Sequence, residues 1–158
     1  MDDKAIIEML QEYLEKNCDY IKSLKIDYLS EDKSWSLEQG ANPMLLKKNV
    51  LGNRRMQLSF TLASRVNVNS ITDSNQKQIL KAFSDISEWM YQKTREGLDI
   101  KLNSGEYAES LSATQNAYLF AVNKDRTQAR YEMPCLFVYK KLKERENNEW
   151  YYFFKFKI

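Results

Sequence analysis

Apolar and polar side chains alternate within the segment Arg55–Val66, and this pattern constrains the fold more than any other feature of the sequence. The apolar positions are Met56, Leu58, Phe60 and Leu62, and the intervening positions are Arg55, Gln57, Ser59 and Thr61. Because successive side chains of a strand point to opposite faces of a sheet, the pattern predicts a strand with one buried face and one wet face. Strands of this kind are typical of antiparallel sheets.

Two other segments have the periodicity of amphipathic helices, from about Asp3 to Leu24 and from about Asp73 to Glu96. In both, apolar residues recur three or four positions apart, which predicts one buried stripe for each helix. The stripes are Ile6, Leu10, Tyr13, Leu14, Cys18 and Ile21 in the first, and Ile79, Leu80, Phe83, Ile86, Trp89 and Met90 in the second. Asp73 and Gln76 have the spacing of a capping box, and Gly97 is expected to end the second helix in a left-handed turn.

Six shorter segments favour strands. They are Ile26–Leu29, Ser34–Glu38, Ala108–Thr114, Tyr118–Val122, Ala129–Lys140 and Trp150–Ile158. We expect the first two to form a small hairpin and residues 40–53 to form a loop, with an edge position or a bulge at Pro134 because proline cannot donate to a ladder. The order of elements predicts an α+β fold, with two main helices packed on one face of a mostly antiparallel sheet. The length of 158 residues fits a single domain, residues 1–158.

The residues that the sequence lacks exclude most kinds of catalysis and ligand binding. There is no histidine, the two cysteines lie far apart, and the four glycines are isolated. These absences exclude histidine-based nucleophile pairs, most zinc sites and glycine-rich phosphate loops, so we expect no catalytic residues, no metal and no cofactor. No pair of acids stands out, and an enzyme that uses a carboxylate or a tyrosine is the last alternative. We also expect neither a membrane span nor a cleaved signal, since the chain has no long apolar run and begins with an acidic segment.

The charges are distributed unevenly along the chain. Residues 1–20 carry six acids against two bases, whereas residues 39–72 contain no acid and five bases, and residues 140–158 carry six bases against three acids. The five bases of the acid-free stretch form a candidate basic patch of Lys47, Lys48, Arg54, Arg55 and Arg65. Two interpretations stay open, an ordinary solvated surface and a patch that contacts phosphates without reading bases.

The segment Trp150–Ile158 has aromatic residues on both faces of the expected strand. A half-wet strand needs only one apolar face, so something should cover the second. The candidates are a helix of the same chain, another protomer, or nucleic-acid bases that stack on the rings, and among the functional interpretations we favour the contact between protomers. The candidate interface consists of Trp150, Tyr151, Tyr152, Phe153, Phe154 and Phe156.

Several segments occur in an order that resembles a family of phage assembly proteins. They are Phe60-Thr61-Leu62-Ala63-Ser64-Arg65, then Phe83 and Trp89, then Tyr118-Leu119-Phe120, Asp125, Ala129-Arg130-Tyr131, Cys135, Leu136 and Tyr139. The set resembles the minor capsid or tail terminator proteins of long-tailed phages and prophages of Gram-positive bacteria. The resemblance covers about residues 25–140, and residues 149–158 are an addition beyond the family's common end.

The resemblance implies a structural role without catalysis. Tail terminators of this family close into a ring, commonly of six subunits, on the head-proximal end of the tail tube, where they stop tube polymerisation and join tail to head. The implied partners are further copies of the chain, the tail tube protein and the head connector proteins, with only weak, nonspecific contact to DNA in the lumen. The expected location is the virion, assembled in the cytoplasm of the host bacterium. The alternatives are a head-completion or minor capsid component and a sequence-nonspecific nucleic-acid-binding module.

Overall fold

The computed structural model describes residues 4–21, 23–26, 34–67, 73–125 and 127–143. The fold is α+β, as predicted, with two helices and a seven-stranded, mostly antiparallel sheet. The elements in chain order are α1 (Ile6–Asn17), β1 (Leu24–Ile26), β2 (Ser34–Gln39), β3 (Met44–Lys48), β4 (Arg54–Asn67), α2 (Asp73–Glu96), β5 (Glu106–Ala113), β6 (Tyr118–Val122) and β7 (Gln128–Lys141).

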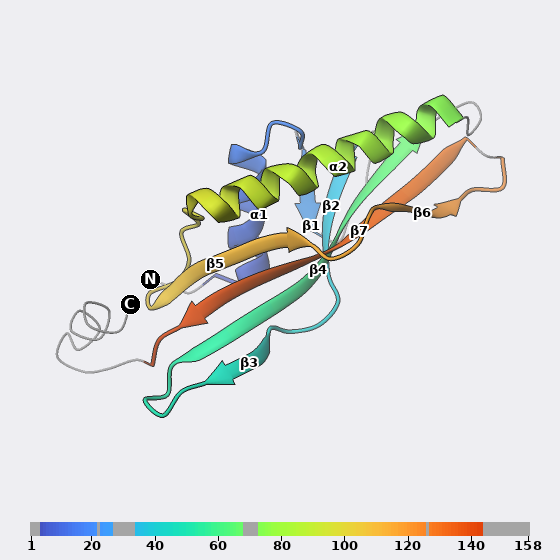
Figure 1. Cartoon of the computed structure of the whole chain (residues 1–158). Helices are drawn as coiled ribbons and strands as arrows, with labels where there is room; N and C mark the ends of the chain where they lie inside the picture. The colour runs from blue at the N-terminus through green and yellow to red at the C-terminus, as the bar shows by residue number, and fades with distance from the viewer. Residues whose placement is uncertain (1–3, 22, 27–33, 68–72, 126, 144–158) are drawn as a thin grey trace.

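The centre of the sheet is one long antiparallel ladder between β4 and β7, which pair from Arg54↔Lys141 to Asn67↔Gln128 (Figure 1). Shorter strands flank each half of this ladder. β3 pairs with the first part of β4 and β2 with its later part, while β5 and β6 pair with opposite ends of β7. The hairpin strand β3 and the strand β6 therefore lie on different edges of the sheet and near opposite ends of the ladder.

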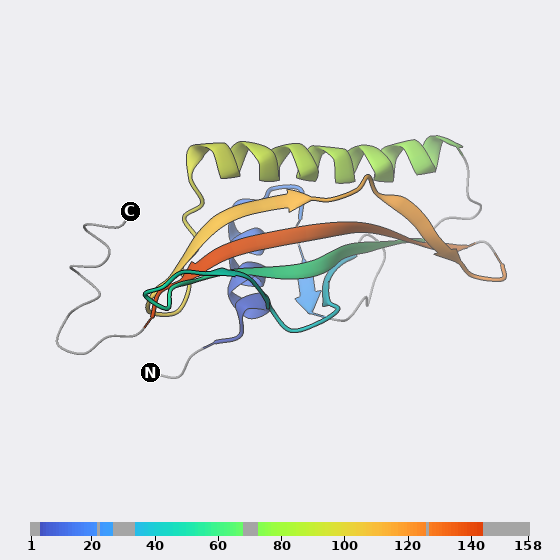
Figure 2. The ribbon, with the colours of Figure 1, turned by 60° about the horizontal axis from the view of Figure 1, so that its bottom comes forward.

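Both helices pack against the same face of the sheet. The buried core contains Leu10 and Leu14 of α1, Phe83 and Ile86 of α2, and the alternate residues of β7. Those β7 residues are Ala129, Tyr131, Met133, Cys135, Phe137 and Tyr139, as the sequence pattern predicts. The two helices also touch each other, since the ring centroids of Tyr13 and Trp89 lie 5.9 Å apart. Figure 2 shows α2 along the length of the sheet.

Helix α2 has the predicted bounds, and Gly97 follows it with a φ of 103°, the left-handed conformation expected of a terminating glycine. Helix α1 is shorter than predicted, because it ends at Asn17 and Cys18 is extended. The side-chain amide of Asn17 donates to the Tyr13 carbonyl at 2.9 Å and so satisfies one of the last carbonyls of the helix. The apolar stripe beyond Asn17 is nevertheless buried, as Cys18 and Ile21 show.

The expected hairpin of the first two strands is wrong, since β1 and β2 pair in parallel, with Leu24 opposite Trp35. The start of β1 is held by α1. The Glu15 carboxylate accepts from the Leu24 amide at 3.0 Å, and the Gln11 side chain donates to the Leu24 carbonyl at 2.7 Å. Because the pairing is parallel, both strands start at the same end of the pair.

Two further expectations need correction. Residues 40–53 are not simply a loop, because the strand β3 lies within them. All five side chains of β3 are exposed, so no buried face marks this strand in the sequence.

Pro134 lies in the central strand β7 rather than at an edge of the sheet. Along β7, it lies between the residues that pair with β5 and the residues that pair with β6. Thr114 donates to its carbonyl there at 2.9 Å. The N–H and C=O groups of one strand residue point to the same side of the strand. Proline has no N–H group, and here that lack falls in the gap between β5 and β6, where no ladder hydrogen bond needs a donor from residue 134.

Candidate docking surface

The β3–β4 hairpin ends in a turn that several hydrogen bonds close. The Asn49 side-chain oxygen accepts hydrogen bonds from the backbone amides of Leu51 and Asn53, each at 3.0 Å, and the Asn49 amide donates to the Asn53 carbonyl at 2.9 Å. Gly52 supplies the positive φ of 90° that the turn requires. This turn holds the Val50 side chain fully in solvent at the tip.

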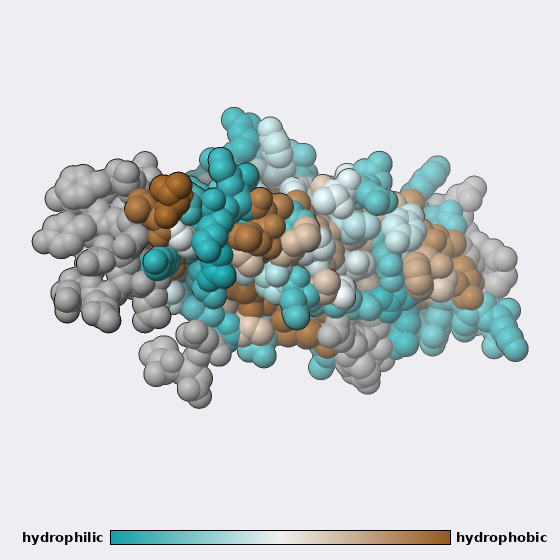
Figure 3. Space-filling model, turned by 90° about the horizontal axis from the view of Figure 1, so that it is seen from below, coloured by the Kyte–Doolittle hydropathy of each residue, from teal (hydrophilic) through white to brown (hydrophobic). Residues whose placement is uncertain are grey.

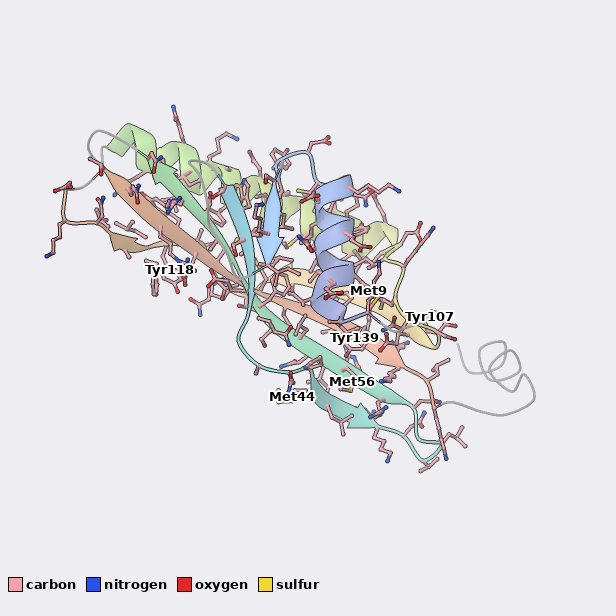
Figure 4. All side chains as sticks on the ribbon, turned by 180° about the vertical axis from the view of Figure 1, so that it is seen from behind. Met9, Met44, Met56, Tyr107, Tyr118 and Tyr139 are labelled. Carbon is pink, nitrogen blue, oxygen red and sulfur yellow. The ribbon has the colours of Figure 1, made fainter. Side chains whose placement is uncertain are left out.

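The hairpin exposes a set of large apolar side chains, which we call the hairpin apolar patch. It consists of Met44, Leu45, Leu46, Val50 and Leu51. Met44 is 55% exposed, and a bulge between Leu45 and Lys47 interrupts the pairing with β4. Figure 4 shows Met44 on β3 next to the strand that carries Met56. In the part of the chain that the structure describes, β3 pairs only with β4, so its other edge offers unpaired backbone groups.

Basic side chains from three strands gather at the same end of the sheet. Lys47, Arg55 and Lys140 lie opposite one another in one row, and Lys48, Arg54 and Lys141 form the next row, which points to the opposite face of the sheet. Lys143 joins them, because its side chain lies against Gly52 in the turn of the hairpin. A Cβ atom added at Gly52 would lie 2.7 Å from Lys143 Cδ. These seven residues are the basic cluster.

Two carboxylates accompany the basic cluster. Arg55 Nε donates to Glu109 at 2.7 Å, and Lys141 Nζ lies 3.9 Å from Glu106. Like charges directly opposite one another destabilise a sheet. Among the described residues this end carries seven cations against two acids, which favours an anionic or acidic partner.

The structure brings together four members of the predicted basic patch and separates the fifth. Arg65 lies ten residues along β4 from Arg55, roughly 33 Å away at strand spacing, and opposite Arg130. Sequence reasoning missed Lys140, Lys141 and Lys143 as members of the cluster. Their only signal is the basic run after the last core residue of β7, and its proximity to the hairpin depends on the register of β4 against β7.

The opposite end of the ladder is charge-balanced. Arg130 donates to Glu38 and, at 2.8 Å, to Glu132, and its guanidinium carbon lies 5.7 Å from the centroid of the Phe120 ring. Burial lowers the pKa of Arg130, but the hydrogen bonds to Glu132 and Glu38 outweigh it, so the pKa lies above its ordinary value.

Strand β6 is a second exposed apolar segment at this charge-balanced end. Tyr118, Leu119 and Phe120 are all exposed, and Phe120 has 57% of its surface in solvent. Figure 4 shows Tyr118 far from Met44, and Figure 3 shows apolar atoms in separate patches between hydrophilic ones. The neighbouring strand β5 is different, because Thr94 of α2 both donates to the Leu111 carbonyl and accepts from its amide. Its edge is partly covered, whereas β6 pairs only with β7 among the described residues.

A shallow groove of about 420 Å³ lies between α2 and the connection from β5 to β6. Its lining residues are Leu80, Ser84, Ser87, Gln115, Asn116, Ala117 and Met133, none of which titrates near neutral pH. The two thiols are buried in the core, and burial raises the pKa of Cys135 to about 12, so it is not poised as a nucleophile. Within the described ranges, no three Cys, Asp or Glu side chains form a group that could hold a metal ion.

Neither described helix combines the length and apolar character that crossing a bilayer requires. The predicted interface of Trp150, Tyr151, Tyr152, Phe153, Phe154 and Phe156 lies outside the described residues, as does the predicted last strand.

No protein-family model matches the chain, and a comparison with curated proteins found no match. The described surface thus offers edge strands and charge for docking, and the groove lacks groups for acid–base chemistry.

Proposed function

We propose that this chain is a structural assembly protein that acts by docking on other protein subunits, with the tail terminator of a long-tailed phage as its specific role. The observation that carries the proposal is the β3–β4 hairpin, where an apolar patch, a basic cluster and a strand edge that no other described strand pairs with coincide. An exposed apolar edge strand is a template for pairing with another chain, although the five-residue length of β3, its bulge and its two lysines protect this edge in part.

The positions of β3 and β6 favour a ring in particular. They lie on different edges of one sheet, so a contact that joins β3 of one copy to β6 of the next is heterologous. Heterologous contacts close into rings when their rotation divides a full turn. The basic cluster at one end and the charge-balanced Arg130 network at the other give the two ends different chemistry, which opposes head-to-head pairing.

The terminator role itself rests on the sequence resemblance, and the basic cluster is compatible with it. A ring around a DNA channel needs phosphate contacts that are weak and blind to sequence, and lysines on a strand surface make contacts of that kind. A head-completion or minor capsid role uses the same docking chemistry and is the nearest alternative.

The test is assembly on purified tail tubes. The chain is measured by light scattering alone and with tubes, and both samples are imaged by negative stain. We expect rings, or caps at one end of the tubes, from the natural chain and from a Leu80→Glu control on α2. A variant carrying Leu45→Glu and Leu46→Glu should fold equally well, because both side chains are exposed, and should form neither rings nor caps. A natural chain that ignores tubes overturns the terminator role.

A second candidate, a nucleic-acid-binding module, is favoured by the seven cations of the basic cluster. Its affinity should fall steeply with salt, and Lys47→Gln with Lys48→Gln should reduce the slope of log affinity against log salt by about 2. Binding without this salt dependence argues against phosphate contacts.

A further inference from the structure

The hairpin apolar patch is the exposed apolar surface of the molecule that a further segment could cover in the free protein. Five large apolar side chains surround a strand edge that has no partner among the described residues, and such edges aggregate when they are left open. The exposed side chains of the sheet elsewhere include small polar ones such as Ser59 of β4 and Ser112 of the edge strand β5. The question is which segment of which molecule lies on β3.

The chain leaves the described structure at the hairpin itself. After β7, the Leu142 amide donates to the Gly105 carbonyl at 2.8 Å, and the Lys143 amide donates to the side-chain oxygen of Asn53 at 2.8 Å. The Lys143 side chain lies over Gly52. Fifteen residues follow, numbered 144–158, and they start next to the turn that joins β3 to β4.

The sequence of these fifteen residues complements the hairpin. Residues 144–149 contain Glu144, Glu146 and Glu149 against one arginine, and they come directly after the basic cluster. Residues 150–158 then supply six aromatic side chains with strand propensity on both faces. Acidic residues come first after β7 and aromatic residues follow them. Along β3, read from Lys48 back to Met44, the lysines likewise come first and the apolar residues follow, so each type of residue would meet its complement.

The geometry permits this placement within one molecule. From β7 across β4 to the outer edge of β3 is three strand spacings, or roughly 14 Å. The six residues 144–149 can span about 20 Å when extended. Because β3 and β7 are both antiparallel to β4, a segment that reverses direction after β7 runs antiparallel to β3. Antiparallel neighbours need only a short connection.

We infer that residues 150–158 add to the free edge of β3 in the same molecule as an antiparallel strand, with their aromatic side chains over the hairpin apolar patch. Residues 150–158 of the same molecule therefore occupy the edge of β3, and an incoming partner would have to compete with them for that edge. The inference concerns the free protein and does not depend on a virion role.

The test is cross-linking of the full-length protein with a short bis-maleimide. One variant carries Leu46→Cys and Phe154→Cys, and the control carries Phe120→Cys on β6 with the same Phe154→Cys. The natural thiols Cys18 and Cys135 are buried, so they do not compete. We expect an internal link at monomer mass in the first variant and at least about tenfold less in the control. Links between two molecules overturn the inference by making a second copy the occupant, and equal yields in both variants also overturn it.

Hydrogen exchange provides an independent readout in case the cysteines disturb the tail. Full-length protein with Phe154→Ser and Phe156→Ser should exchange its β3 amides about tenfold faster or more, with β6 unchanged. Unchanged exchange at β3 overturns the inference. Both measurements use the protein without tail tubes, so their failure leaves the tube-capping test of the proposed function intact.

Discussion

Replacing Asn49 by alanine should open the β3–β4 hairpin while leaving the core intact. The substitution removes the acceptor of two backbone hydrogen bonds, from the amides of Leu51 and Asn53. A hydrogen bond between neutral groups contributes about 0.5–1.5 kcal/mol net, and the Asn53 amide is in a buried residue where water replaces it poorly. We therefore expect the hairpin to lose about 1–2 kcal/mol.

This loss should be local. None of the five side chains of β3 belongs to the buried core, so opening the hairpin leaves the core packed. A loss of 1–2 kcal/mol corresponds to about 5–30-fold faster exchange of the β3 amides, with a nearly unchanged free energy of global unfolding in urea. Hydrogen exchange read by mass spectrometry measures the first quantity, and urea titration measures the second.

The chain offers a matched control at the opposite end of the ladder. The Asn123 side-chain oxygen accepts from the amides of Thr127 and Gln128, at 2.9 Å and 3.1 Å, in the turn between β6 and β7. Asn123→Ala should accelerate exchange in β6 and leave β3 unchanged. If Asn49→Ala leaves β3 exchange unchanged, or lowers global stability by its full effect, the hairpin is not the independent unit described above.

Three further predictions concern the core and the charged network. Phe137→Ala removes a fully buried ring that stacks on Tyr139 at 5.6 Å, and it should lower the free energy of unfolding by about 3–5 kcal/mol in urea titration. Burial raises the pKa of Tyr139 from its ordinary value of 10.0 to about 12. The stabilisation by the neutral Tyr139 is therefore complete below pH 10 and is lost as the pH rises to about 12. Tyr139→Phe should flatten the fall in the free energy of unfolding over that pH range. Arg130→Gln should lower the free energy of unfolding by about 1–3 kcal/mol, because it leaves the buried Glu132 with one partner fewer. Arg55→Gln should lower it by less than about 1 kcal/mol, because the pair of Arg55 with Glu109 is more exposed. Urea titration should therefore give a lower midpoint for Arg130→Gln than for Arg55→Gln.

The sequence predicted the elements whose periodicity reflects burial on one side. The bounds of α2, the strand β4 and the buried face of β7 were all predicted, because their apolar stripes are long and face one core. It did not predict β3, since a strand with both faces exposed leaves no alternation to read. It also missed the parallel pairing of β1 with β2, which depends on the anchoring of Leu24 to α1, a contact between residues nine or more positions apart.

The candidate docking surface was predictable only in part, for a related reason. The acid-free stretch pointed to Lys47, Lys48, Arg54 and Arg55, which do lie together. The lysines of β7 join them through the register of the central ladder, and Arg65 is separated by the length of β4. Register is set by the packing of the whole sheet, so local sequence patterns do not report it. The exposure of β6 was missed because Tyr118, Leu119 and Phe120 have the composition of a buried strand.

The long pairing of β4 with β7 has a mechanical consequence. Fourteen residue pairs joined side by side make a beam roughly 45 Å long, and β3 and β6 are attached near its two ends. The helices stiffen one face of this beam along most of that length. A molecule built this way keeps a fixed distance between β3 and β6, so the spacing of any array joined through both strands would follow from the number of residue pairs in the β4–β7 ladder.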